Sequence, residues 1–180
     1  MSKKPPVAPD FGFTRGPFAL ICGMPHNHDT LNDPAVAQKP ELRLRALESF
    51  LIENGHIEPP VLSALISAFG NRIDPDASPA MAIGGEPDQS PAQVGAAAML
   101  AIPRDSLGPV FRENWEGLAF ALALALADRG TFTWAEWAEV FGQEIKDAHA
   151  DGDRDGHYYG YWVATLEQIV AHKGLAARAG

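Results

Sequence analysis

PVFRENWE at residues 109–116 opens the stretch that decides the fold; GTFTWAEW at 130–137 and YYGYW at 158–162 follow, and Gly174 closes it. This stretch contains all four tryptophans and all three tyrosines of the 180-residue chain. It also carries the clearest helix signals, but it has no cysteine and no phosphate-binding loop. The pattern is typical of a surface that binds a partner rather than of a catalytic centre.

Three helices are expected in this stretch. The first runs from about Arg112 to Asp128 and is apolar on both faces, because Leu118 and Leu122 line one side and Phe120 lies on the other. Such a helix is either sandwiched between neighbours or keeps one face for a partner. The other two span about 134–149 and 157–172, each with an apolar stripe at helical spacing. Short connections between them predict a small three-helix bundle.

Capping signals indicate where these helices begin and end. Thr133 followed by Glu136 forms a capping box, in which each side chain bonds a backbone N–H of the other residue. Phe132 and Trp137 stand at the two positions of a hydrophobic staple. Gly130 is placed to end the first helix.

Three further units are expected upstream. Residues 1–40 are rich in Pro, Gly, Asp and Asn and predict a disordered arm. Residues 41–70 predict a hairpin of two helices, which is too small to bury its own core and must pack on the bundle of this chain or of a second copy. Residues 71–108 predict a linker with one short helix near 94–100, and residues 109–175 form the bundle. No segment shows convincing strand alternation, so the expected fold class is all-α.

Bulk composition limits the classes of function. The net charge is −9 and the isoelectric point is near 5, which disfavours nucleic acid and anionic membranes as partners. Cys22 is the single cysteine, so an internal disulfide and a thiolate metal cage are excluded. The longest apolar run, 118–127, is shorter than the ~18 residues that a membrane-spanning helix needs. We find no convincing signal peptide and expect a cytoplasmic protein.

One segment imitates a metal site. Asp151, Asp153, Asp155 and Gly156 match the first half of a calcium-binding loop. The twelfth position, which should hold a bidentate glutamate, is Trp162. A solvated turn is therefore expected, and a calcium-responsive module remains only an alternative.

Other candidate groups favour structural roles. His26 and His28 have no surrounding residues to orient their rings around a metal. Glu113 and Glu116 lie near a helix start, where carboxylates stabilise the positive end of the helix dipole. We therefore expect this chain to have no catalytic residue and to bind no metal or cofactor.

The aromatic residues are the remaining candidates. Most of them are needed as core anchors, but four tryptophans exceed what so small a core requires, and aromatic side chains are frequent binding hot spots. The candidate partner-binding residues are Phe111, Trp115, Trp134, Trp137, Tyr158, Tyr159 and Trp162.

Taken in order, the three quoted motifs and Leu166-Glu167 resemble the accessory (activator) protein of nitrile hydratase. They also resemble the helical N-terminal half of the nitrile hydratase β subunit, to which that accessory is similar. Upstream, the segment from Arg43 to Ile57 resembles the N-terminal helices of the nitrile hydratase α subunit. The cysteine motif of an α subunit and the C-terminal half of a β subunit are not found in this sequence.

This resemblance implies a role in maturation. The chain would be an accessory chaperone that binds the α subunit of a nitrile hydratase of the cobalt type and assists its metal loading and transfer into the enzyme. Cobalt or iron would then belong to the partner. The alternative is a structural β-like subunit of a nitrile hydratase or a thiocyanate hydrolase. Self-association through residues 41–70 also stays open.

Overall fold

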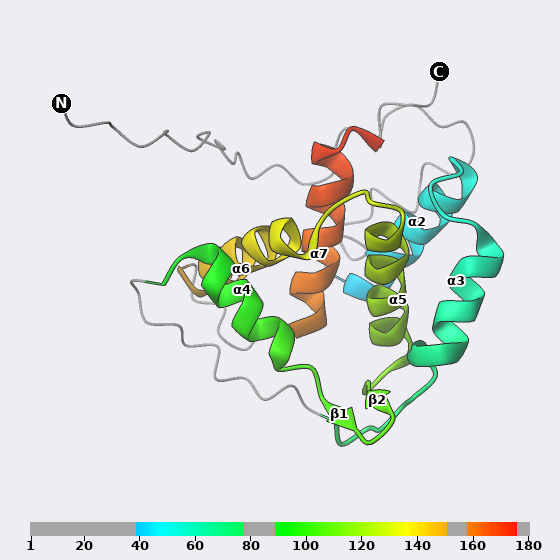
Figure 1. Cartoon of the computed structure of the whole chain (residues 1–180), viewed down its shortest axis with the longest axis horizontal. Helices are drawn as coiled ribbons and strands as arrows, with labels where there is room; N and C mark the ends of the chain where they lie inside the picture. The colour runs from blue at the N-terminus through cyan, green and yellow to red at the C-terminus, as the bar shows by residue number, and fades with distance from the viewer. Residues whose placement is uncertain (1–38, 78–88, 151–157, 176–180) are drawn as a thin grey trace.

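The computed structural model describes residues 39–77, 89–150 and 158–175 (Figure 1). The fold is all-α apart from one minimal hairpin, which confirms the expected fold class. The elements are α2 (Pro40–Glu53), α3 (Pro59–Leu65), the π-helix η1 (Ile66–Gly70), α4 (Pro91–Leu100), β1 (Arg104–Asp105), β2 (Gly108–Pro109), α5 (Asn114–Asp128), α6 (Trp134–Ala150) and α7 (Tyr158–His172). The disordered arm predicted before Lys39, the histidine pair and the calcium-like loop lie outside the described residues.

Helix α5 lies at the centre of the fold. Of the eleven positions from Glu116 to Leu126, all except Leu124 are buried, so the helix is enclosed on all sides. Helices α2 and α3 and the π-helix pack on it from one direction, and α7 packs on it as well (Figure 1). The apolar character of both faces, noted in the sequence, therefore reflects a sandwiched helix. The predicted docking of residues 41–70 on the bundle of this chain is confirmed by these contacts.

Helix α4 crosses α6 at very short range. A Cβ added to Gly95 would lie 1.8 Å from the carbonyl oxygen of Ala138, and one added to Gly142 would lie 1.7 Å from that of Pro91. The two backbones therefore touch where side chains would normally separate them. The described part of 71–108 is thus packed into the body of the protein, which the expectation of a linker did not anticipate.

Short backbone pairings close the lower end of the molecule in Figure 1. Strands β1 and β2 pair antiparallel, and Ile73 forms a parallel bridge with Phe111. The sequence predicted no strand here. Two-residue strands are too short to show the alternation by which a strand is recognised.

The capping predictions are confirmed. The Glu136 carboxylate accepts a hydrogen bond from the Thr133 backbone N–H at 2.7 Å, and the Glu136 N–H donates to the Thr133 hydroxyl at 3.2 Å. The rings of Phe132 and Trp137 are 5.2 Å apart, as a staple requires. Gly130 follows α5 with φ of 73°, a conformation that glycine adopts without strain.

Gly142→Ala tests the crossing of α4 and α6. Alanine is the better helix former by about 1 kcal/mol, so an open site would gain stability. At this crossing the new methyl group would overlap the Pro91 carbonyl, and we expect the free energy of unfolding to fall by roughly 1–3 kcal/mol. Urea unfolding monitored by circular dichroism measures the change.

Ala97→Gln is the matched control, because it adds a larger side chain to the exposed side of α4. We expect it to change stability by less than about 0.5 kcal/mol. A Gly142→Ala variant as stable as the wild type would show that the two helices are not in backbone contact.

Candidate partner-binding surface

Five of the seven candidate aromatic residues are buried inside this chain. Their exposed fractions are 7% or less, and they are Phe111, Trp137, Tyr158, Tyr159 and Trp162. Trp115 is half-buried and Trp134 is 38% exposed. The structure therefore divides the predicted set into core anchors and two residues with accessible ring surface.

The buried rings form one continuous cluster. Trp137 and Trp162 are 4.8 Å apart between ring centroids, and Phe111 meets Tyr159 at 5.7 Å. The Tyr158 hydroxyl donates a hydrogen bond of 2.6 Å to the carbonyl oxygen of Ala98, which ties α7 to α4. Burial raises the pKa of both Tyr158 and Tyr159 above the usual value of a phenol. These rings stabilise the fold, and a partner could not reach them without opening it.

Trp134 begins α6 and lies at the edge of this cluster. Its ring meets Phe132 at 5.8 Å and Trp137 at 6.0 Å, in both cases edge to face. Two neighbours thus fix the orientation of an exposed indole, so little side-chain entropy remains to be lost on binding. Among the candidate residues, Trp134 best meets the requirements of an anchor for a partner.

Trp115 lies at the start of α5. Its indole N–H donates to the Glu113 carboxylate at 3.0 Å, and its ring meets Tyr159 edge to face at 6.4 Å. The orientation of this ring is therefore also fixed. Glu113 and Asn114, the two residues before it, are both exposed.

The two accessible tryptophans lie at opposite ends of α5. Trp115 is the second residue of this helix, whereas Trp134 follows the loop that leaves its other end (Figure 1). The two residues therefore belong to separate parts of the fold, Trp115 to the start of α5 and Trp134 to the start of α6.

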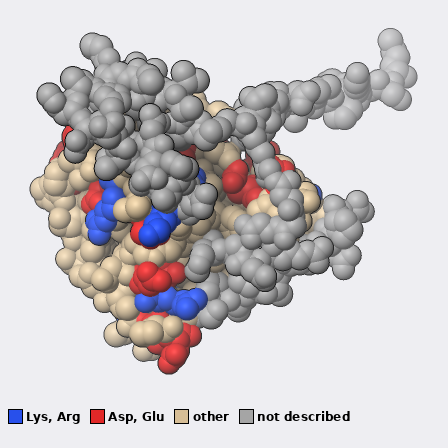
Figure 2. Space-filling view, turned by 180° about the vertical axis from the view of Figure 1, so that it is seen from behind, with Lys and Arg blue, Asp and Glu red and all other residues tan. Residues whose placement is uncertain are grey.

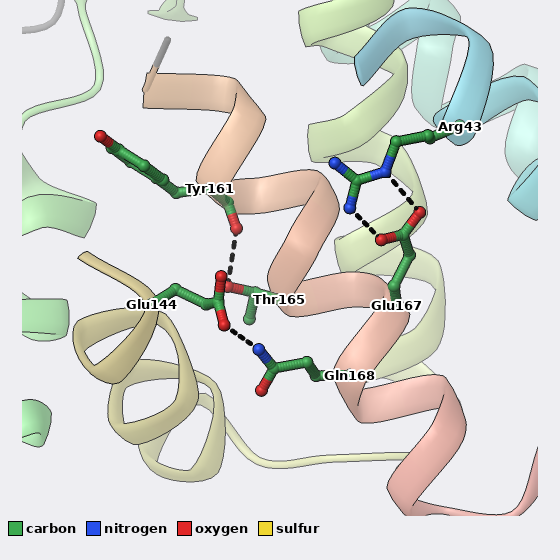
Figure 3. A network of polar contacts seen from close by, with 6 residues as sticks. All are labelled: Arg43, Glu144, Tyr161, Thr165, Glu167 and Gln168. Carbon is green, nitrogen blue, oxygen red and sulfur yellow. Dashed lines mark hydrogen bonds and ion pairs between the residues drawn. The ribbon is translucent and has the colours of Figure 1, made fainter. Parts of the chain in front are cut away.

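A polar network joins α2, α6 and α7 (Figure 3). The Arg43 guanidinium of α2 binds both oxygens of Glu167 on α7, with Nε at 3.0 Å from Oε1. Glu144 of α6 accepts a hydrogen bond from the Gln168 amide, and the Thr165 hydroxyl donates to the Tyr161 carbonyl at 2.8 Å. The sequence did not predict the pairing of Arg43 with Glu167, because residues 124 positions apart leave no local signal.

Glu116 is a buried carboxylate beneath Trp115. It is 7% exposed and accepts hydrogen bonds from the backbone N–H groups of Arg112, at 2.7 Å, and Glu113, at 3.4 Å. Burial outweighs these bonds and raises the pKa of Glu116. Its hydrogen bonds are those of a helix start, in agreement with the structural role expected for Glu113 and Glu116.

The described residues hold no group of three or more His, Cys, Asp or Glu side chains placed to bind a metal ion. On the face shown in Figure 2, acidic and basic side chains lie in small mixed groups separated by uncharged areas. No continuous basic tract for a nucleic-acid backbone is visible on that face. Within the same residues, no helix has the length and apolar character needed to cross a membrane.

Glu116→Gln tests the electrostatic consequence of burial. Because the folded pKa of Glu116 is raised, the folded chain binds this proton more tightly than the unfolded chain does. The stabilising contribution is complete below the unfolded pKa and is lost as the pH rises through the folded pKa. We expect the wild type to lose stability relative to Glu116→Gln as the pH rises above the ordinary glutamate pKa of about 4.3, as measured by urea unfolding at each pH.

Glu139→Gln, at an exposed position of α6, controls for the loss of one carboxylate. A stability difference between wild type and Glu116→Gln that stays constant as the pH rises would contradict the assignment.

Comparison with known families gives one match. The family model "Nitrile hydratase beta subunit, N-terminal" matches residues 80–180, which is more than half of the chain. The matched range contains α4, the hairpin, α5, α6 and α7, and hence all seven candidate aromatic residues. Searches of curated proteins and of solved structures gave no match. Because this match covers the aromatic bundle and more than half of the sequence, the chain belongs to the family of the nitrile hydratase β-subunit N-terminal domain.

Proposed function

We propose that this chain binds the α subunit of a nitrile hydratase and contributes no catalytic residue itself. The observation that carries the proposal is the family match across the aromatic bundle. It is supported by two fixed aromatic side chains with accessible surface and by the lack of a metal-binding group among the described residues. Cobalt or iron would be held by the partner.

Within this proposal, we favour an accessory role. The chain would hold the α subunit while that subunit acquires its metal, and would then release it to the mature enzyme. The motifs quoted from residues 109–137 and 158–167 resemble those of such accessory proteins, which is the reason for preferring this role.

A lasting β-like subunit of a nitrile hydratase or a thiocyanate hydrolase is the second candidate. The matching family model describes the β subunit itself, which favours this reading. The two roles differ in permanence, since an accessory leaves the mature complex and a subunit stays in it. Affinity purification of the active enzyme, followed by mass spectrometry, distinguishes them by whether this chain is retained.

Trp134→Ala and Trp115→Ala test which end of α5 contacts the α subunit. Removal of a central aromatic anchor typically costs 2 kcal/mol or more, so we expect about thirtyfold weaker binding for at least one variant. Titration of the full chain with the purified cognate α subunit, followed by calorimetry, measures the affinity.

Val61→Ala is the control, because Val61 is a comparably exposed apolar residue on a different helix. We expect its affinity to equal that of the wild type. If the wild-type chain formed no complex with the α subunit, in its apo or metal-loaded form, the proposed function would be wrong.

A further inference from the structure

The arm formed by α2, α3 and η1 is attached to the bundle in two different ways. At its η1 end, backbone meets backbone: a Cβ added to Gly117 would lie 2.3 Å from the Gly70 carbonyl oxygen. Beyond η1, the Phe111 N–H donates to the Arg72 carbonyl at 2.9 Å, and the Asp74 N–H donates to the Phe111 carbonyl at 2.7 Å. This end of the arm is therefore fixed to α5 and to the segment before it.

Helix α2 packs on α5 and α7 through its side chains. Leu44, Leu47 and Leu51 are buried against α5 and α7, and Arg43 forms its paired hydrogen bonds with Glu167 (Figure 3). Among the described residues, no backbone hydrogen bond joins α2 to either of these helices. A helix of 14 residues is only marginally stable by itself, so α2 depends on this face for its structure.

The face formed by α5 and α7 lies within the family match, whereas α2, which covers it, lies outside that match. The family match begins at residue 80 and includes α5 and α7, whereas α2 ends at Glu53 and lies outside it. The face that receives α2 is thus part of the family domain, and the helix that fills it is not.

We propose that α2 is an exchangeable cover on a helix-binding face of α5 and α7. The competing ligand is an amphipathic helix with the chemistry of α2: apolar residues spaced as Leu44, Leu47 and Leu51, preceded by an arginine for Glu167. That this helix belongs to the α subunit rests on the proposed function; the exchange itself does not.

The two kinds of contact have separate roles in recognition. The leucines supply the burial that favours binding, which any apolar helix could provide. The paired hydrogen bonds between Arg43 and Glu167 depend on register, because a guanidinium matches a carboxylate in one planar arrangement. Glu167 therefore selects the helix that presents an arginine at the correct position.

A competition experiment on the full chain tests the exchange. The probe is a fluorescein-labelled peptide with the sequence of residues 39–57, and its binding is followed by fluorescence anisotropy. Arg43→Ala in the chain weakens the cover but leaves the arginine of the peptide intact. We expect the peptide to bind this variant about tenfold more tightly than it binds the wild type. In the double variant Arg43→Ala/Glu167→Gln, the peptide should bind about tenfold more weakly than it binds Arg43→Ala, because the arginine of the peptide has lost its carboxylate partner.

Arg45→Ala is the matched control, since Arg45 is an exposed arginine of the same helix and pairs only with Glu48 among the residues described. It should leave peptide binding at the wild-type level. Equal affinities for wild type and Arg43→Ala, or affinities insensitive to Glu167→Gln, would overturn the proposal.

Hydrogen exchange on the wild-type chain gives a second test that does not depend on a variant. The backbone amides of α2 should exchange when α2 alone detaches, while the amides of α5 and α7 remain protected from exchange. Exchange of all three helices in one global event would overturn the proposal. Neither test uses the α subunit. The exchange of α2 can therefore be disproved independently of whether the chain binds the α subunit.

Discussion

The constraint on which the structure depends is the apolar surface of α5. From Glu116 to Leu126 this helix is buried and apolar on nearly every side, so each neighbouring element covers part of its surface. Helix α7 supplies aromatic rings. The arm of α2, α3 and η1 supplies aliphatic side chains, the ring of Phe69 against Phe120, and the close approach of Gly70 to Gly117. A bundle of α5, α6 and α7 alone would leave part of that surface in water. The arm therefore covers apolar surface of α5 that would otherwise be exposed to water.

Much of this fold follows from local sequence. The helices appear near the expected positions, because their apolar spacing, Gly130 and the Thr133–Glu136 box act within one or two turns. Helix α5 begins two residues later than expected, at Asn114, since Arg112 and Glu113 instead donate their N–H groups to Glu116. Such differences at helix ends are small and have local causes.

The candidate surface was less predictable for a physical reason. Helical spacing shows that Trp137 and Trp162 share a stripe with other apolar residues, but it does not show what lies opposite that stripe. Tertiary packing encloses both rings and leaves Trp134, only three residues from Trp137, accessible. The pairing of Arg43 with Glu167 and the contact of Gly95 with Ala138 likewise depend on how distant helices meet. The one glycine inside each of these two helices, Gly95 in α4 and Gly142 in α6, is the only hint of such a crossing that the sequence contains.

The arrangement of the tryptophans has an optical consequence. Trp137 and Trp162 are fully buried and lie 4.8 Å apart, close enough for their electronic transitions to couple, whereas the ring of Trp134 is exposed. Near-ultraviolet dichroism of this chain is thus dominated by the packing of the interior. Fluorescence quenching by a dissolved small molecule instead reports on the two accessible indoles, those of Trp115 and Trp134. The integrity of the core and the occupancy of the surface can be followed in the same sample without an added label.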